Sequence, residues 1–438
     1  AEKRGDLTEA ERLYRESLTI RKEIGDRGGE ATSLGNLGNI ANTRGDLAGA
    51  ERLYRESLAI GREVGDRKAE SILLICLGTI ANTRGDLAKA ERLYRESLAT
   101  MREIGDRKAE ATSLGCLGDI AKTRGDLAEA ERLYRESLAI GREVGDRGGE
   151  ATSLIRLGNI TDTQGDLAGA ERLYRESLAI RKEIGDRGGE AASLNNLGNI
   201  AKTQGNLDEA ERLYRGGLAI NREIGDQQDE AASLGNLGLI AITRGDLAEA
   251  ERLHRESLSI VREIGDLKGE AALLNNLGTI AEKRNDLAEA ERLSQESVVA
   301  SRAIGYRTNE AYSLENLGDI AKTRGDLAEA ERLYRESLAI KREVGDRQGE
   351  ATSLNSLGNM AQTRGDLAEA ERLYRESLAI KREVGDRQGE ATSLNSLGNM
   401  AQTRGYLAEA ERLHRESLAI EREIGIPMVS QDFFNQFE

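Results

Sequence analysis

A strict repeat of 40 residues runs through the chain and constrains its fold more than any other feature of the sequence. The tripeptide Gly45-Asp46-Leu47 marks the phase of the repeat, and the same place recurs every 40 residues from Gly5 to Gly405 without an insertion. Leu34 and Gly38 are identical in all ten copies of their segment. Because a unit this short cannot bury a core alone, the chain is expected to form an array in which every unit packs on its neighbours.

The composition narrows the class of the repeating unit. Trp is absent, there are three Phe and one Pro, and 32% of the residues are charged, which is typical of long amphipathic helices rather than of a sheet-based enzyme. The formal net charge of −15 and the mixed signs along the chain disfavour nucleic acid or an anionic membrane as a partner. The sequence has no run of about 18 apolar residues, the length that is needed to span a bilayer. No signal peptide is visible either, so a cytoplasmic location is expected.

Each unit is predicted to contain two helices. Leu47, Ala50 and Leu58 recur at three- and four-residue steps, which predicts an amphipathic helix over roughly 47–64, here called helix B. A second apolar stripe predicts another helix over roughly 68–84, here called helix A. Neither helix buries its apolar stripe alone, so each hairpin must stack on the next.

Residues at the helix ends support these boundaries. Asp46 is the expected N-cap of helix B, and Gly65 suits the left-handed residue that follows it. Asp126 with Glu129 matches a capping box. The recurring Arg-Gly-Asp tripeptide is therefore interpreted as a helix end, a glycine and an N-cap rather than as an adhesion signal.

These residues resemble the signature of a known family. Leu34-x2-Leu37-Gly38-x2-Ala41, followed by Ala50-x3-Tyr54, is similar to the tetratricopeptide repeat, with Leu34 where Trp is commonest and Tyr54 where Phe is common. The usual Pro is missing, and a longer helix B lengthens the unit from about 34 to 40 residues. This variant resembles the repeats of the LGN/Pins polarity adaptors and, more loosely, those of kinesin light chains and bacterial regulators.

The resemblance implies an all-α fold, a right-handed superhelical solenoid of about ten stacked antiparallel helix pairs plus one extra helix B, over residues 1–425. It also implies that the array binds a protein or an extended peptide, and it implies neither catalysis nor a cofactor.

In the family, the first helix of each hairpin lines a concave groove, and its polar positions are the candidate site here. Asn recurs at two such positions, and carboxamides bind the main chain of an extended peptide. Arg156 and neighbouring basic residues are then expected to select acidic side chains. The alternative is that these positions are only solvated and free to vary. The candidates are Asn36, Asn39, Asp119, Arg156, Asn159, Asn195, Asn196, Asn199, Asn236, Asn276, Asn316, Asp319, Asn359 and Asn399.

One unit, residues 286–325, departs from the repeat and carries Tyr312 at the edge of the expected groove. Tyr312 is interpreted as a ligand anchor. The unit itself is interpreted either as a more flexible point in the superhelix or as the result of neutral sequence drift.

Cys and His offer little chemistry. Cys76 and Cys116 occupy equivalent places in adjacent units, where stacked helices hold their Cα atoms too far apart for a disulfide, so free thiols are expected. His254 and His414 replace the Tyr54-type residue and are interpreted as packing substitutions. No His, Cys and carboxylate spacing predicts a metal site.

The two ends and one internal duplication complete the organisation. Ala1-Glu2-Lys3-Arg4 matches the end of a helix A, so the array is expected to begin inside a unit of a longer protein. Residues 323–365 are identical to 363–405. The tail 426–438 breaks the repeat and holds every Phe. It is expected to cap the last helix, to begin a further domain, or to dock into a groove and mediate self-association.

The sequence therefore favours a scaffold that binds a partner polypeptide without catalysis. The alternative is a sensory or autoinhibitory arm of a larger bacterial signalling enzyme, such as a protease or an ATPase. A structural or engineered scaffold without a natural ligand is a third possibility, and the partner itself stays open.

Overall fold

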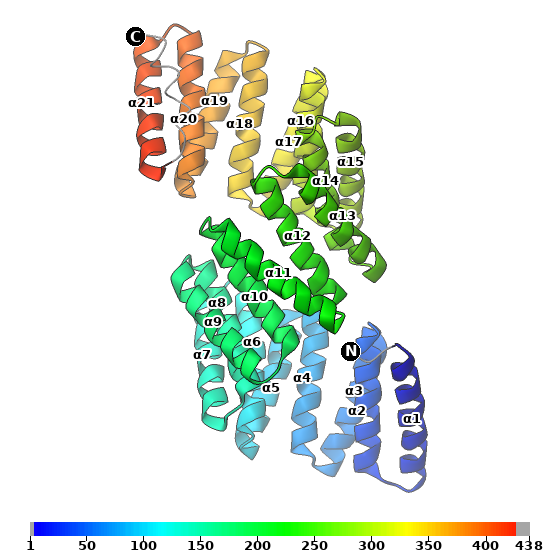
Figure 1. Ribbon diagram of the computed structural model, residues 1–438. Coiled ribbons are helices and arrows are strands. Elements are labelled where there is room, and N and C mark those ends of the chain that lie inside the picture. Colours follow the sequence, from blue (N-terminus) through cyan, green and yellow to red (C-terminus); the bar gives the residue numbers. More distant parts are fainter. Residues whose placement is uncertain (1–3, 426–438) are drawn as a thin grey trace. The chain divides into compact units, whose positions relative to one another are not determined.

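The computed structural model describes residues 4–425, and Figure 1 shows them as a succession of α-helices joined by short turns. No strand occurs in this part of the chain. The tail 426–438 lies outside the described residues. The helices are α1 (Arg4–Glu23), α2 (Arg27–Thr43), α3 (Leu47–Val64), α4 (Arg67–Thr83), α5 (Leu87–Ile104), α6 (Arg107–Thr123), α7 (Leu127–Val144), α8 (Arg147–Thr163), α9 (Leu167–Glu183), α10 (Arg187–Thr203), α11 (Leu207–Ile224), α12 (Gln227–Thr243), α13 (Leu247–Ile264), α14 (Leu267–Lys283), α15 (Leu287–Ala303), α16 (Arg307–Thr323), α17 (Leu327–Val344), α18 (Arg347–Thr363), α19 (Leu367–Glu383), α20 (Arg387–Thr403) and α21 (Leu407–Ile424).

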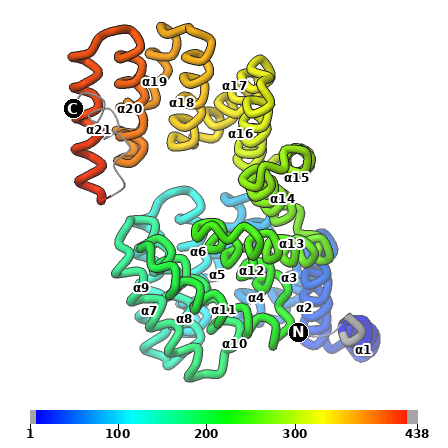
Figure 2. The backbone as a smooth tube through the Cα atoms, turned by 45° about the horizontal axis from the view of Figure 1, so that its top comes forward, coloured from blue at the N-terminus to red at the C-terminus, as the bar shows by residue number. Residues whose placement is uncertain are grey.

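The helix pattern confirms the predicted all-α hairpin array. The even-numbered helices are helix A and the odd-numbered ones helix B; α3 has the expected bounds, and α4 lies one residue earlier than expected. Apart from α12, which contains the boundary between the two units described below, each helix A packs most extensively on the helix B that follows it, as α4 does on α5, and it also contacts the preceding helix B. Figure 2 traces the backbone through this alternation. None of the described helices combines the length and the apolar character needed to cross a membrane.

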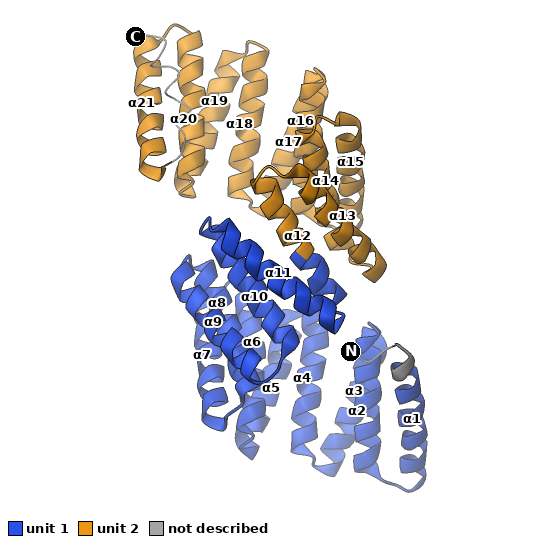
Figure 3. Ribbon diagram, in the orientation of Figure 1, with its two compact units in different colours: residues 1–233 blue, residues 234–438 orange. Residues whose placement is uncertain are grey.

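The chain divides into two compact units, shown in Figure 3. Unit 1 covers residues 1–233 and unit 2 covers 234–438, so the boundary falls inside α12. Within each unit the hairpins stack in chain order. Every contact described below lies within one unit.

The turns confirm the predicted caps. Asp46 accepts a hydrogen bond from the Gly49 N–H at 2.8 Å, and Gly65 follows the same helix with φ of 76°. Asn285 is the one non-glycine residue with positive φ in the described chain, at 61°. Asn tolerates this conformation better than other side chains, which explains why it replaces the usual glycine without shifting the repeat.

The predicted capping box is wrong in its second half. Asp126 accepts a hydrogen bond from the Glu129 N–H at 3.1 Å, as expected. The Glu129 carboxylate, however, pairs with Arg132 at 2.7 Å. The Asp126 N–H donates instead to the Ala121 carbonyl of the preceding helix at 3.0 Å. Because the turn geometry already satisfies this N–H, the glutamate is left to form a surface ion pair.

The hairpin core explains why the repeat needs a glycine beside a tyrosine. Tyr54 of helix B lies with its ring against Gly38 of helix A, and a Cβ on Gly38 would stand 2.5 Å from the ring carbon Cε1. Behind the ring, the buried Ser57 hydroxyl donates to the Ala31 carbonyl at 2.7 Å. One packing solution is thus copied along the chain.

Ion pairs join successive hairpins around a buried carboxylate. Glu70 is buried, and it is held by Arg62 Nε at 2.7 Å and Arg67 Nη1 at 2.8 Å. The same two guanidinium groups also reach the next helix B, where they pair with Glu96 and Glu103. A buried carboxylate needs such partners because its desolvation is costly.

Candidate functional site

Many of the predicted groove residues accept a hydrogen bond from a tyrosine of their own hairpin. Tyr54 donates its hydroxyl proton to Asn39 Oδ1 at 2.7 Å. Burial raises the pKa of Tyr214 to about 12, so the hydroxyl stays a donor. The same bond recurs from Tyr134 to Asp119 at 2.7 Å, Tyr174 to Asn159 at 2.7 Å, Tyr214 to Asn199 at 2.6 Å, Tyr334 to Asp319 at 2.7 Å and Tyr374 to Asn359 at 2.7 Å.

This bond fixes the orientation of each carboxamide. Asn159 and Asn199 give their side-chain oxygen to the tyrosine, while both residues remain partly exposed on their helices. The NH2 group is then the free end of the side chain, and it is a hydrogen-bond donor. We call the side chains at the positions of Asn36 and Asn39 in successive units the polar ladder.

Successive helices A also pair with each other through the polar ladder. Arg156 of α8 donates to Asp119 of α6 at 2.7 Å, and its guanidinium lies 5.8 Å from the centre of the Tyr134 ring. Its charge therefore already faces a carboxylate of the fold. Whether Arg156 also selects acidic ligands stays a prediction.

In unit 2 an asparagine makes the corresponding connection. Asn316 of α16 donates from Nδ2 to Asn275 Oδ1 and to Thr279 Oγ1 of α14, each at 3.0 Å. Four other members of the polar ladder stay partly exposed, namely Asn36, Asn196, Asn236 and Asn276, and Asn399 is exposed.

Asn195 is hydrogen-bonded to the next helix A. Its Oδ1 accepts a hydrogen bond from the Ser233 hydroxyl of α12 at 3.2 Å. The buried Asn221 of α11 reaches the same hydroxyl through Nδ2 at 3.4 Å. Asn195 is therefore part of the contact between hairpins.

Tyr312 interacts with its own chain rather than standing free. Its hydroxyl donates to Asp346 at 2.8 Å, and the ammonium of Lys341 lies 4.7 Å from its ring centre. Burial, followed by the bond to Asp346, raises the pKa of Tyr312 well above its usual range. The residue remains 39% exposed, and its role as a ligand anchor stays a prediction.

Sequence reasoning missed the partner beneath that ring. Lys341 is 1% exposed and donates to Glu315 at 2.5 Å. Burial raises the pKa of Glu315, and the nearby Lys341 ammonium opposes that rise. The sequence did contain a signal for this buried lysine. Gly or an apolar residue occupies the Lys341 position in several other units, such as Gly61 and Val261.

The Cys and His residues are held in packed positions. Cys76 and Cys116 are both free thiols, as predicted, and burial raises the pKa of Cys116 to about 11. His254 is fully buried, and burial lowers its pKa to about 4. Among the described residues, no three of the His, Cys, Asp and Glu side chains are grouped so that they could hold a metal ion.

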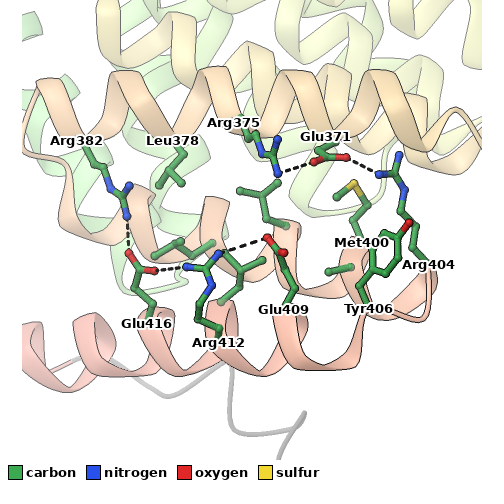
Figure 4. A pocket seen from close by; sticks show the side chains of 14 residues that line it. Glu371, Arg375, Leu378, Arg382, Met400, Arg404, Tyr406, Glu409, Arg412 and Glu416 are labelled. Atoms are coloured by element: carbon green, nitrogen blue, oxygen red, sulfur yellow. Dashed lines mark hydrogen bonds and ion pairs between the residues drawn. The ribbon is translucent and has the colours of Figure 1, made fainter.

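A furrow lies on another side of helix A, between successive helices B. Figure 4 shows the one between α19 and α21, of about 320 Å³, with Leu378 and Met400 among its lining. Glu371 at its rim pairs with Arg375 at 2.6 Å and with Arg404. The furrow recurs elsewhere, for example between α5 and α7, so it is a product of the repeat.

The comparisons identify the repeat. The sequence model of the tetratricopeptide repeat matches residues 1–63, 68–143, 110–183, 189–263, 269–343 and 349–423. The chain belongs to the tetratricopeptide repeat family. No curated protein matches its sequence.

Solved structures share the fold of this tetratricopeptide repeat chain at low sequence identity. The quorum sensor NprR from B. thuringiensis is 13% identical, with a TM-score of 0.59, and the match covers 82% of this chain and 99% of that one. The apo form of RapI is 16% identical, with a TM-score of 0.52, covering 63% and 99%. A signal transduction ATPase with a tetratricopeptide repeat sensor, from Pyrococcus horikoshii, is 15% identical, with a TM-score of 0.56, covering 76% and 53%.

Proposed function

We propose that this tetratricopeptide repeat chain is a protein-interaction scaffold that binds an extended polypeptide along its polar ladder, without catalysis. The family to which the chain belongs supports interaction with proteins as the general function. The burial of His254 and His414 in packing positions, at 0% and 1% exposure, agrees with a binding role.

The tyrosine bond to the carboxamide oxygen is the observation that carries the proposal. In unit 1, Asn159 and Asn199 are each oriented by a buried tyrosine, at 2.7 and 2.6 Å. An extended peptide presents carbonyl oxygens along its main chain, and pre-oriented NH2 groups are suitable donors to them. Because the fold has already restricted these side chains, little conformational entropy is lost on binding.

The test separates the donor from the acceptor of each carboxamide. Changing Asn159→Asp and Asn199→Asp removes both NH2 groups but keeps an oxygen for Tyr174 and Tyr214, as Asp119 does for Tyr134. Peptides selected on the unaltered chain from a random library serve as probes, and fluorescence anisotropy gives Kd. We expect the double variant to bind at least about ten-fold more weakly, with an unchanged unfolding midpoint.

Two controls accompany this measurement. Arg175→Ala alters an exposed ion pair with Glu171 on α9, away from the polar ladder, and should leave Kd unchanged. Repeating the titration at high salt screens the two added charges. Equal Kd values for the double variant and the unaltered chain would refute main-chain recognition by the polar ladder.

A sensory arm of a larger signalling enzyme is the second candidate. The fold similarity to the sensor-bearing ATPase over 76% of this chain favours it. The reading frame that surrounds this sequence tests it, since an adjoining ATPase or protease domain is expected for a sensor. A frame that encodes only the array would favour a free adaptor.

A further inference from the structure

Two stretches of identical sequence, 323–365 and 363–405, place the same lysine in different surroundings. In the first, Lys341 of α17 donates to Glu315 Oε2 of α16 at 2.5 Å and to Ser353 Oγ of α18 at 3.0 Å. The Ser353 hydroxyl in turn donates to Glu315 Oε1 at 3.2 Å. One carboxylate is thus held between an ammonium and a hydroxyl.

The second copy has the same cation but no such carboxylate. Lys381 of α19 is 6% exposed, and within the described chain its ammonium makes no hydrogen bond or ion pair. Asn355 of α18 stands where Glu315 stands in the first copy. Asp386 attracts Lys381 only from a distance, and it is engaged as the N-cap of α20 through Gly389 N–H at 2.8 Å.

Asn355 is also unlike its counterparts in other hairpins. Asn195 and Asn275 both accept a hydrogen bond from the serine of the next helix A, at 3.2 and 3.0 Å. The Asn355 Oδ1 atom is buried and has no hydrogen-bond partner in the described chain. The corresponding serine, Ser393, lies 3.3 Å from Ser377 instead.

A nearly buried lysine whose ammonium has no partner and a buried amide oxygen without a partner are both costly. In the first copy a carboxylate removes that cost. Lys381 and Ser393 are the equivalent residues of the second copy, where the lysine side chain lies against Gly389. Asn355 lies next to Ser356 and one helical turn before Asn359 of the polar ladder, and it is partly exposed. A ligand that lies along the polar ladder therefore meets Asn355 before it meets Lys381.

We propose that Lys381, Ser393 and Asn355 form a binding site for a carboxylate that comes from outside the fold and takes the part that Glu315 plays beside Lys341. Once the Lys381 side chain turns from Gly389 into the conformation of Lys341, its ammonium and the Ser393 hydroxyl donate to the two oxygens of the carboxylate. Rotation of the Asn355 amide turns its NH2 group toward the same carboxylate. This proposal rests on the proposed function in one respect only, the source of the carboxylate, which is the side chain of Asp or Glu in an extended ligand.

The test observes both lysines in the full chain. NMR spectra are recorded on protein labelled with ¹³C at the lysine ε-carbons, and Lys381→Met and Lys341→Met assign the two signals. N-acetyl-glutamate N-methylamide, whose only charge is the side-chain carboxylate, is titrated in, with the glutamine analogue as the uncharged control. We expect the Lys381 signal to shift saturably with the glutamate compound alone, while the Lys341 signal stays fixed.

Asn355→Glu is the matched variant, because it supplies the internal carboxylate found in the first copy. It should raise the unfolding midpoint, move the Lys381 signal toward that of Lys341, and weaken binding at least about ten-fold. Three results would overturn the proposal: a Lys381 signal that does not respond to the carboxylate, one that responds equally to the glutamine analogue, or an affinity that is unchanged in Asn355→Glu.

A second arm distinguishes the sources of the carboxylate. A blocked Gly-Gly-Glu-Gly-Gly peptide that binds more tightly than the single blocked residue supports a peptide ligand. Equal affinity supports a small free carboxylate at the same site. Because this site lies in unit 2, its failure is distinct from failure of the Asn159 and Asn199 test in unit 1.

Discussion

Hairpins α10–α11 and α14–α15 fill the same place in the repeat with different side chains. In the first, Tyr214 is fully buried against Gly198, and its hydroxyl bonds Asn199 at 2.6 Å. In the second, Ser294 replaces the tyrosine, and its buried hydroxyl has no hydrogen-bond partner in the described chain.

Replacing the tyrosine by serine coincides with a new hydrogen bond to the next helix A rather than with one inside the hairpin. Thr279 of α14 receives its hydrogen bond from Asn316 of α16 at 3.0 Å, and these two helices pack directly on each other. In this pair of hairpins, Asn199 is bonded by the tyrosine of its own hairpin, whereas Thr279, whose hairpin has no tyrosine, is bonded from the next hairpin. In a third hairpin, His254 takes the place of the tyrosine against Gly238, and both imidazole nitrogens are without a hydrogen-bond partner in the described residues.

The largest predicted effect concerns that histidine. Burial lowers the folded-state pKa of His254 to about 4, against about 6.5 in an unfolded chain. Stability from the neutral ring is fully present above the unfolded value and is lost as pH falls toward the folded value. The loss approaches about 3 kcal/mol. We expect His254→Phe to remove this part of the pH dependence in urea unfolding between the two values.

Carboxylates titrate in the same range, so the difference between the two unfolding curves is the informative quantity. It should widen steadily as pH falls through the window. A constant difference between His254→Phe and the unaltered chain would show that the imidazole is protonated in the folded state without cost.

Gly198→Ala should have the next largest effect. The new Cβ would stand 2.6 Å from Cε1 of Tyr214, and such overpacking costs about 1–3 kcal/mol. Gly278→Ala is the matched control, because its Cβ would meet the small Ser294 hydroxyl at 2.7 Å. Rotation of the Ser294 side chain about its Cα–Cβ bond moves Oγ away and relieves the contact, and alanine favours a helix over glycine by about 1 kcal/mol. Urea unfolding should show Gly198→Ala clearly destabilised and Gly278→Ala nearly neutral; equal losses would contradict this account.

The fold was predictable because the period copies one set of local choices. Leu34, Gly38 and Tyr54 recur at fixed places, and Asp46 with Gly65 sets the helix ends. The one failed detail, the capping box, depended on the Asp126 N–H, which the turn itself satisfies.

The candidate site was predictable only as a list of polar positions. Tyr54 was expected to pack in the core, and its hydroxyl bond to Asn39 spans 15 residues, so no local pattern reveals it. Lys341 and Lys381 are indistinguishable within their identical copies, and a residue of the helix A that precedes each of them, Glu315 or Asn355, decides their surroundings. The repeat thus determines the backbone, whereas the hydrogen bonds and charges around a given side chain depend on residues that vary between units.

Removing the tyrosine hydroxyl alone should have a smaller effect. Tyr214→Phe keeps the ring on Gly198 but deletes the bond to Asn199, which contributes about 1 kcal/mol. A double-mutant cycle with Asn199→Ala isolates that interaction from other losses. Additive losses in urea unfolding would mean that the hydroxyl does not stabilise the hairpin.

The smallest predicted effect concerns a tyrosine hydroxyl and Cys116, a cysteine of the next hairpin. Burial raises the pKa of Cys116 to about 11, while the charge of Arg156 and, to a smaller extent, a hydrogen bond with Tyr94 act to lower it. At pH 8 roughly one thiol in a thousand is then ionised, so native Cys116 should react with a thiol reagent far more slowly than in denaturant. Tyr94→Phe should slow the native reaction slightly further, because the thiolate loses a donor. Measuring this in Cys76→Ser removes the second thiol, and a faster reaction in Tyr94→Phe would mean that the ring shields Cys116 rather than stabilising its thiolate.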